Sequence, residues 1–211
     1  MNVEKLYQTA FESPIGLRMG EFMMKKPKLE LIEQAERLVL EFRRKGFHCS
    51  ESVFSAVNTT LGITDPSMVR IVTGFHGGGG SHRKDPEADL TSCLEEVASG
   101  RERRPPEEWP VVVTGHLCGA LASGIVCIGL LFGRRQPTDD LTCADELAYE
   151  LHRRFEAKFG VKTCRELRQK YVPLSDNHTC EYIYQQGARM AVELILEAPD
   201  LVDLCLGHRP E

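Results

Sequence analysis

The segment from Trp109 to Gly133 contains no Asp, Glu, Lys or Arg, and this constrains the fold more than any other feature of the chain. An uncharged stretch this long must be shielded from water, either by burial inside a folded domain or by crossing a membrane. Gly115, Gly119, Gly124 and Gly129 dilute its hydrophobicity. It also carries polar and reactive side chains, namely His116, Cys118 and Ser123. We therefore expect a buried central helix over about 113–132 rather than a membrane span.

The rest of the chain has a helical period. Apolar residues recur every three or four positions, which is the spacing of one buried helix face. This pattern predicts helices at residues 28–45, 50–61, 66–74, 137–159, 164–172 and 180–196. Alternating runs typical of strands are missing, and the one short β-branched run, Val111–Val113, leads into the apolar helix. The predicted fold class is all-α: a compact bundle of five or six helices around the central glycine-rich helix.

The length of 211 residues fits a single helical domain, residues 1–211. Composition divides it further. We expect an N-terminal extension at 1–26, a helical core at 27–80 and 110–197, a loop-rich insertion at 81–109 and a tail at 198–211. The insertion is polar and then charged and proline-rich, with at most one helical turn near 90–98.

Charge and cysteine usage limit the classes of function. The net charge is -5 and no long Lys/Arg run occurs, so we expect no nucleic-acid partner. The N-terminus lacks the apolar stretch of a secretory signal, which favours a cytoplasmic protein. Its eight cysteines are then expected to be thiols, ligands or transient disulfides. We expect no membrane partner, and the glycine-rich helical surfaces allow a homodimer.

Four cysteines lie at predicted helix starts: Cys49, Cys118, Cys164 and Cys180. A helix N-terminus directs free N–H groups and partial positive charge outward, which favours the thiolate that ligates metals or attacks disulfides. Four helix starts can converge at one end of a bundle. Four thiolates suit an iron–sulfur cluster or zinc, and two suffice for a dithiol. Without any CxxC pair the folded bundle must assemble the site, and without CxxCH no haem attachment is expected.

The other cysteines and three histidines are less informative. His48, His116 and His178 each lie within two residues of one of the four cysteines, where a histidine could ligate a metal or lower a thiol pKa. We favour the simpler interpretation of ordinary polar surface residues. The remaining cysteines match no such pattern: Cys93, Cys127, Cys143 and Cys205. Cys127 is expected in the core, because it lies about half a turn round the helix from Cys118.

The sequence CGALASG at 118–124 resembles the CGAxxG motif of the redox-active C_GCAxxG_C_C protein family. The resemblance covers about residues 30–196. Its four cysteines correspond to Cys49 in GFHCSES, Cys118, Cys164 in FGVKTCREL and Cys180, with a glycine loop at 77–80. One departure is clear: the family usually passes from the glycine loop to CGAxxG in a few residues, whereas about thirty intervene here.

The resemblance implies redox chemistry. A related domain of split-Soret-type cytochromes is associated with an iron–sulfur cluster. This implies a cluster, [2Fe–2S] being one candidate, held by the four cysteines with Gly119 beside it, and electron transfer with an unknown redox partner protein. A metal-free thiol–disulfide redox protein and a zinc or other metal-binding module remain as alternatives. Whether the protein is an enzyme is not indicated.

Overall fold

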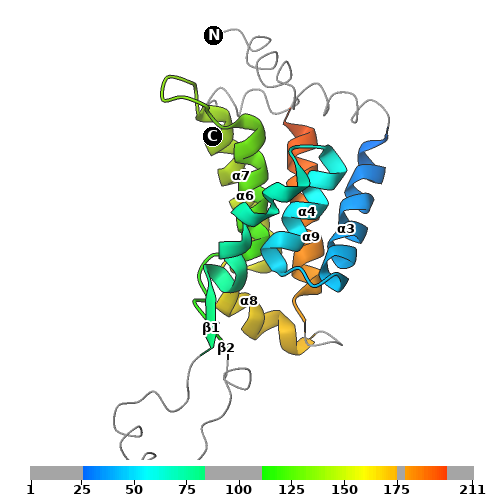
Figure 1. Ribbon diagram of the computed structural model, residues 1–211, viewed down its shortest axis with the longest axis vertical. Helices are drawn as coiled ribbons and strands as arrows, with labels where there is room; N and C mark the ends of the chain where they lie inside the picture. The colour runs from blue at the N-terminus through cyan, green and yellow to red at the C-terminus, as the bar shows by residue number, and fades with distance from the viewer. Residues whose placement is uncertain (1–25, 84–110, 175–178, 199–211) are drawn as a thin grey trace, which may run out of the picture.

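The computed structural model describes residues 26–83, 111–174 and 179–198, which form a helical bundle (Figure 1). Its α-helices are α3 (Lys28–Arg44), α4 (Cys49–Leu61), α6 (Gly119–Phe132), α7 (Thr142–Phe159), α8 (Cys164–Tyr171) and α9 (Glu181–Glu197). The prediction of an all-α bundle is confirmed, with the helix positions close to those that periodicity gave.

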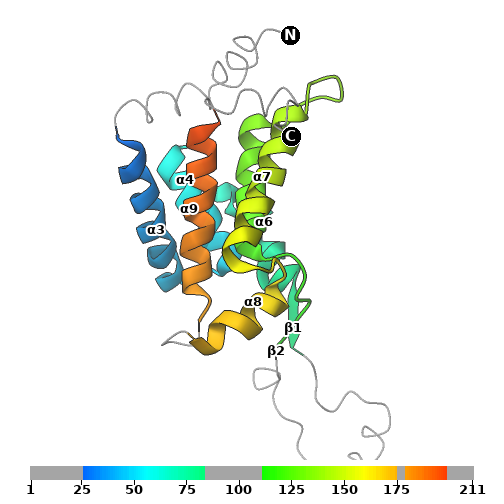
Figure 2. The same cartoon turned by 180° about the vertical axis from the view of Figure 1, so that it is seen from behind.

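The long helices run side by side, and α8 lies across one end of them (Figures 1 and 2). Helix α9 contacts α3, α4, α6 and α7, while α4 also contacts α3 and α6. Helix α3 buries one stripe of its surface, formed by Leu31, Ile32, Ala35 and Val39. This is the i, i+1, i+4, i+8 spacing of an amphipathic helix, so the sequence pattern and the packing agree.

Helices α4 and α6 form the interior of the bundle. Eleven of the thirteen residues of α4 are buried, against eight of the fourteen in α6. The Ser123 hydroxyl donates a buried hydrogen bond of 2.7 Å to the Ser50 carbonyl and ties the two helices together. Gly124 lets α7 approach, since a Cβ there would lie 2.7 Å from Leu151 Cδ2. No helix in the described part of the chain combines the length and apolar composition that a membrane crossing needs.

The apolar helix begins later than its sequence predicts. Strand β2 (Val111–Val113) pairs antiparallel with β1 (Ser81–Arg83), and α6 starts only at Gly119. Two physical reasons explain the difference. The β-branched valines favour extended backbone, and Gly115 adopts a left-handed φ of 78° that no continuous helix contains. The prediction of loop structure at 81–83 is therefore wrong; the rest of the insertion, including 90–98, lies outside the described residues.

Two other segments differ from expectation. Residues 66–78 form two 3₁₀ helices, η1 (Pro66–Ile71) and η2 (Thr73–Gly78), although Asp65 caps the first of them as predicted. Helix α7 begins at Thr142 rather than near 137. Asp139 accepts backbone N–H groups of the preceding turn and Asp140 accepts that of Thr142, so their side chains stabilise a turn there. The short helix η4 (Val172–Leu174) follows α8.

Candidate functional site

Each of the four predicted site cysteines stands at the start of a helix. Cys49 and Cys164 are the first residues of α4 and α8, and Cys118 and Cys180 precede the first residues of α6 and α9. The predicted placement at helix starts is therefore confirmed. It matters for the chemistry, because the first N–H groups of a helix have no partners within the helix and are free to bond to sulfur.

Short pairing between two loops fixes Cys118 relative to Cys164. Leu117 and Thr163 form an antiparallel bridge. On either side of it, the Cys118 N–H donates to the Lys162 carbonyl at 3.0 Å and the Cys164 N–H donates to the His116 carbonyl at 2.6 Å. Both cysteines therefore lie on one face of the pair as diagonal neighbours, for which a spacing of about 7–8 Å is typical.

The glycine loop packs against this pair. The Gly77 carbonyl accepts from the Gly115 N–H at 2.9 Å, and the Gly78 carbonyl accepts from the His116 N–H at 3.1 Å. Gly78 has a left-handed φ of 82°. A Cβ on it would lie 2.6 Å from the His116 nitrogen and 2.8 Å from Cys164 Cβ. Only glycine satisfies both the backbone angle and the close approach.

Cys49, at the start of α4, lies near the same glycine loop. The backbone N–H of Gly77 lies near the Cys49 sulfur and lowers the pKa of that thiol. A Cβ on Gly119 would stand 2.7 Å from Cys49 Sγ and 3.0 Å from the Phe75 carbonyl oxygen. The glycine that follows Cys118 thus makes room for the thiol of Cys49. The expected contact of Gly119 with a cofactor stays a prediction.

Burial dominates the electrostatics of the thiols. Cys49, Cys118 and Cys164 are each at most 9% exposed, whereas Cys180 is only half-buried. Desolvation raises the pKa of Cys118 to about 12 and that of Cys164 to about 11. The expectation that a position at a helix start would lower these pKa values is therefore wrong, because the net effect is an increase. N–H groups of Gly77 and Ser50 do lower the pKa of Cys49, but burial outweighs them there as well.

The four thiols influence one another. A charge on Cys49 raises the pKa of Cys118, Cys164 and Cys180. A charge on Cys180 also raises that of Cys164. The four side chains therefore share one electrostatic region. By contrast, burial alone raises the pKa of Cys127, which lies fully buried in the core.

This arrangement predicts a pH dependence for the reduced, metal-free protein. A thiol whose folded-state pKa is raised stabilises the fold fully below its unfolded value, and this stabilisation disappears as pH rises toward the folded value. For Cys118 the window runs from 9.0 to about 12. We expect the thermal midpoint of unfolding to fall between pH 9 and 11. Cys118→Ala is expected to reduce the dependence of the free energy of unfolding on pH in this range by up to ~1.4 kcal/mol per pH unit. The same pH dependence in the wild type and the variant would contradict this.

The histidines occupy the rim. His48 is exposed, and its backbone N–H donates to Glu51 Oε2 at 2.9 Å in a capping box. Its ring stacks on that of His76, with centroids 3.9 Å apart. His116 is also exposed, and His178 lies outside the described residues. The positions of His48 and His116 agree with the surface interpretation of these residues.

Sequence reasoning missed two neighbours of the thiols. Tyr184 hydrogen-bonds to Cys180, and burial raises the pKa of its phenol so that it stays a donor. A signal existed, since residues i and i+4 share a helix face. His76 was noted only as flanking the glycine loop; burial lowers its pKa, and its Nδ1 has no hydrogen-bond partner among the described residues.

The remaining cysteines do not belong to this cluster. Cys127 is separate, as described above, and Cys143 is disulfide-bonded, which supplies no thiol. Cys93 and Cys205 lie outside the described residues. The five free cysteines of the described residues are therefore the four near the glycine loop and Cys127.

The donor set fits a cluster better than a single ion. Within the described ranges, no group of three or more His, Cys, Asp or Glu side chains could hold a metal ion. Tetrahedral zinc needs its thiolates at about 2.3 Å from one centre, and this geometry does not provide that. A cluster is wider, because its separate irons each bind their own thiolates. The chain offers three buried thiols and one half-buried thiol, with backbone N–H groups near those of Cys49 and Cys118, and such a set would fit that larger group.

Comparison with known proteins agrees with this reading of the cysteines. Residues 110–194 match the family model described as "Putative redox-active protein (C_GCAxxG_C_C)". The match includes Cys118, Cys164 and Cys180 but not Cys49, whose membership of the cluster rests on the contacts above. No curated protein and no solved structure matches the chain. Over residues 110–194, the chain is therefore similar to the family described by that model.

Proposed function

We propose that Cys49, Cys118, Cys164 and Cys180 ligate an iron–sulfur cluster and that the protein transfers electrons. One observation carries the proposal: four free cysteines at four helix starts share one largely buried region, where each of the other three senses the charge of Cys49. Such a set has the ligand number and type that clusters use.

The chain's own residues would prepare the site in three ways. Backbone N–H groups of Gly77 and Ser50 lower the pKa of Cys49, and those of Ala120 and Leu121 lower the pKa of Cys118, which favours the thiolate form that binds metal. Gly119 and Gly78 leave space for close approach of the ligand-bearing loops. Surrounding apolar packing excludes water. When bound, a cluster would supply one-electron oxidation and reduction.

The two alternatives have less support. Zinc lacks a group of ligands close enough together among the described residues. In a thiol–disulfide centre, Cys118 and Cys164 make a poor pair. Disulfides usually join Cα atoms about 4.4–6.8 Å apart, whereas diagonal neighbours are typically about 7–8 Å apart. The buried thiols also have raised pKa values, which slows their attack on a disulfide.

The absorption spectrum of anaerobically purified protein tests the proposal. We expect visible charge-transfer bands, with iron and acid-labile sulfide in equal, stoichiometric amounts, either on purification or after reconstitution. A colourless protein that binds zinc stoichiometrically would support the metal-binding alternative. A colourless, metal-free protein that loses two thiols on mild oxidation would support the dithiol alternative. Either result would overturn the proposed cluster.

A further inference from the structure

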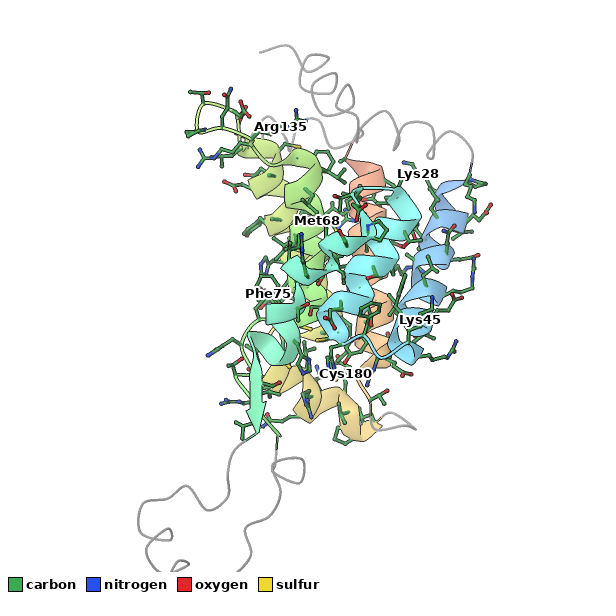
Figure 3. The ribbon with its side chains drawn as sticks, in the orientation of Figure 1. Lys28, Lys45, Met68, Phe75, Arg135 and Cys180 are labelled. Carbon is green, nitrogen blue, oxygen red and sulfur yellow. The ribbon has the colours of Figure 1, made fainter. Side chains whose placement is uncertain are left out.

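Cys180 is the place where the cysteine cluster approaches solvent. The other three thiols are buried to more than nine-tenths, whereas Cys180 is partly exposed. It precedes α9 at the end of the bundle that α8 crosses (Figures 1 and 3). An electron that enters or leaves the buried group therefore meets the least protein beside Cys180.

Two arginines from other elements lie at the same end of the bundle as this cysteine. Arg43 belongs to the last turn of α3 and the exposed Arg168 to α8, and both elements reach the end where Cys180 precedes α9 (Figures 1 and 3). In the described part of the chain, no ion pair joins either arginine to a carboxylate.

Further cations reinforce this end of the molecule. Exposed basic residues at the end of α3 and on α8 are Arg44, Lys45, Arg165 and Lys170. Figure 3 shows Lys45 and Cys180 at the same end of the bundle, with Arg135 and Lys28 at the other. Carboxylates lie nearby as well. Glu51 and Glu166 accept hydrogen bonds from backbone or hydroxyl groups and keep their negative charge, and Glu181 follows Cys180 directly.

We propose that electrons enter and leave through the Cys180 edge, and that Arg43 and Arg168 dock a one-electron carrier protein with an acidic face. The inference rests on the proposed function, since it assigns that site its partner chemistry. Complementary charges guide diffusional encounter more than they add affinity. In each transfer one electron leaves the reduced protein and reduces the acceptor by one electron, and no covalent bond or proton moves.

Small oxidants of opposite charge provide the test. The loaded, reduced protein is mixed in a stopped-flow instrument with ferricyanide, an anion, or hexaamminecobalt(III), a cation. Despite the net charge of -5, we expect the ferricyanide rate to fall as ionic strength rises, because the local cations dominate. A ferricyanide rate that rises with salt would show that the overall charge governs access, and would overturn the inference.

A matched pair of variants sharpens the result. Arg168→Glu is expected to slow oxidation of the protein by ferricyanide about fivefold at ~10 mM ionic strength and to speed oxidation by the cobalt complex. Arg135→Glu makes the same change in net charge at the opposite end and is expected to leave both rates within about 1.5-fold. Equal effects of the two variants would overturn the inference. Far-UV circular dichroism and iron content confirm that both variants are folded and loaded.

Failure of the proposed function can be told apart from failure of this inference. If no cluster forms, the access route is measured on the bare thiols with Ellman's reagent, a dianion, and with neutral dithiodipyridine. We then expect Arg168→Glu to slow only the dianion, in a phase that Cys180→Ser removes. Slowing of both reagents alike, or of neither, would overturn the docking surface.

Discussion

Cys118→Ser is expected to remove the visible absorption together with the bound iron and sulfide. Cys118 is the N-cap of α6, and the backbone N–H groups of Ala120 and Leu121 lower the pKa of its thiol against the larger effect of burial. Serine keeps the shape but replaces a soft thiolate with a hydroxyl that binds iron poorly. Metal and sulfide analysis of the purified variant gives the answer, and Cys49→Ser, Cys164→Ser and Cys180→Ser are expected to lose the same content.

Two comparisons make this expectation sharp. Cys127→Ala removes a buried thiol from the same helix as Cys118 and should keep full iron content, with about 1 kcal/mol lost from a small cavity. Cys49→Ser tests the proposed ligand that lies outside the family match. The assignment of Cys49 rests on the close approach of its sulfur to Gly119. If Cys127→Ala loses as much iron as Cys118→Ser, or Cys49→Ser keeps it, the assignment of ligands is wrong.

Gly78→Ala is expected to destabilise the fold by about 2–5 kcal/mol. A left-handed backbone angle costs a non-glycine residue about 1–2 kcal/mol, and forcing a methyl group into packed atoms about 1–3 kcal/mol more. The added Cβ would meet a backbone nitrogen at 2.6 Å and Cys164 Cβ at 2.8 Å. Urea denaturation, read by circular dichroism, measures the change in the free energy of unfolding.

Neighbouring glycines separate the two contributions. Gly80 has a left-handed φ of 119° but nothing within 4 Å of an added Cβ, so Gly80→Ala carries strain alone, about 1–2 kcal/mol. Gly74 has neither feature, and Gly74→Ala should stay within about 0.5 kcal/mol of the wild type. If Gly78→Ala lowers the free energy of unfolding by no more than Gly80→Ala, the glycine loop does not approach Cys164 as closely as described.

The fold was largely predictable because helix periodicity is a local property. The stripe of α3 and the cap at Asp65 follow from spacing and residue type alone. Where prediction failed, a tertiary partner decided the conformation. Val111–Val113 reads as the start of a helix until β1 pairs with it, and the two strands lie far apart in the sequence.

The candidate site divides in the same way. The positions of its cysteines at helix starts could be predicted, since caps and periodicity mark those starts. Their protonation could not be, because desolvation depends on how completely the assembled bundle covers each sulfur. The contact between Gly119 and Cys49 could not be predicted either. It depends on how closely α4 and α6 approach where glycine has no side chain. Tyr184 was within reach of sequence reasoning, one turn beyond Cys180.

The bridge between Leu117 and Thr163 has a consequence for damage and repair. Because it holds Cys118 and Cys164 on one face but diagonally apart, a disulfide between those two sulfurs would strain the paired loops. Under the proposed function, a protein stripped of its iron would keep this pair of ligands in register. Reloading would then need no reductase to reopen a bond between those two residues.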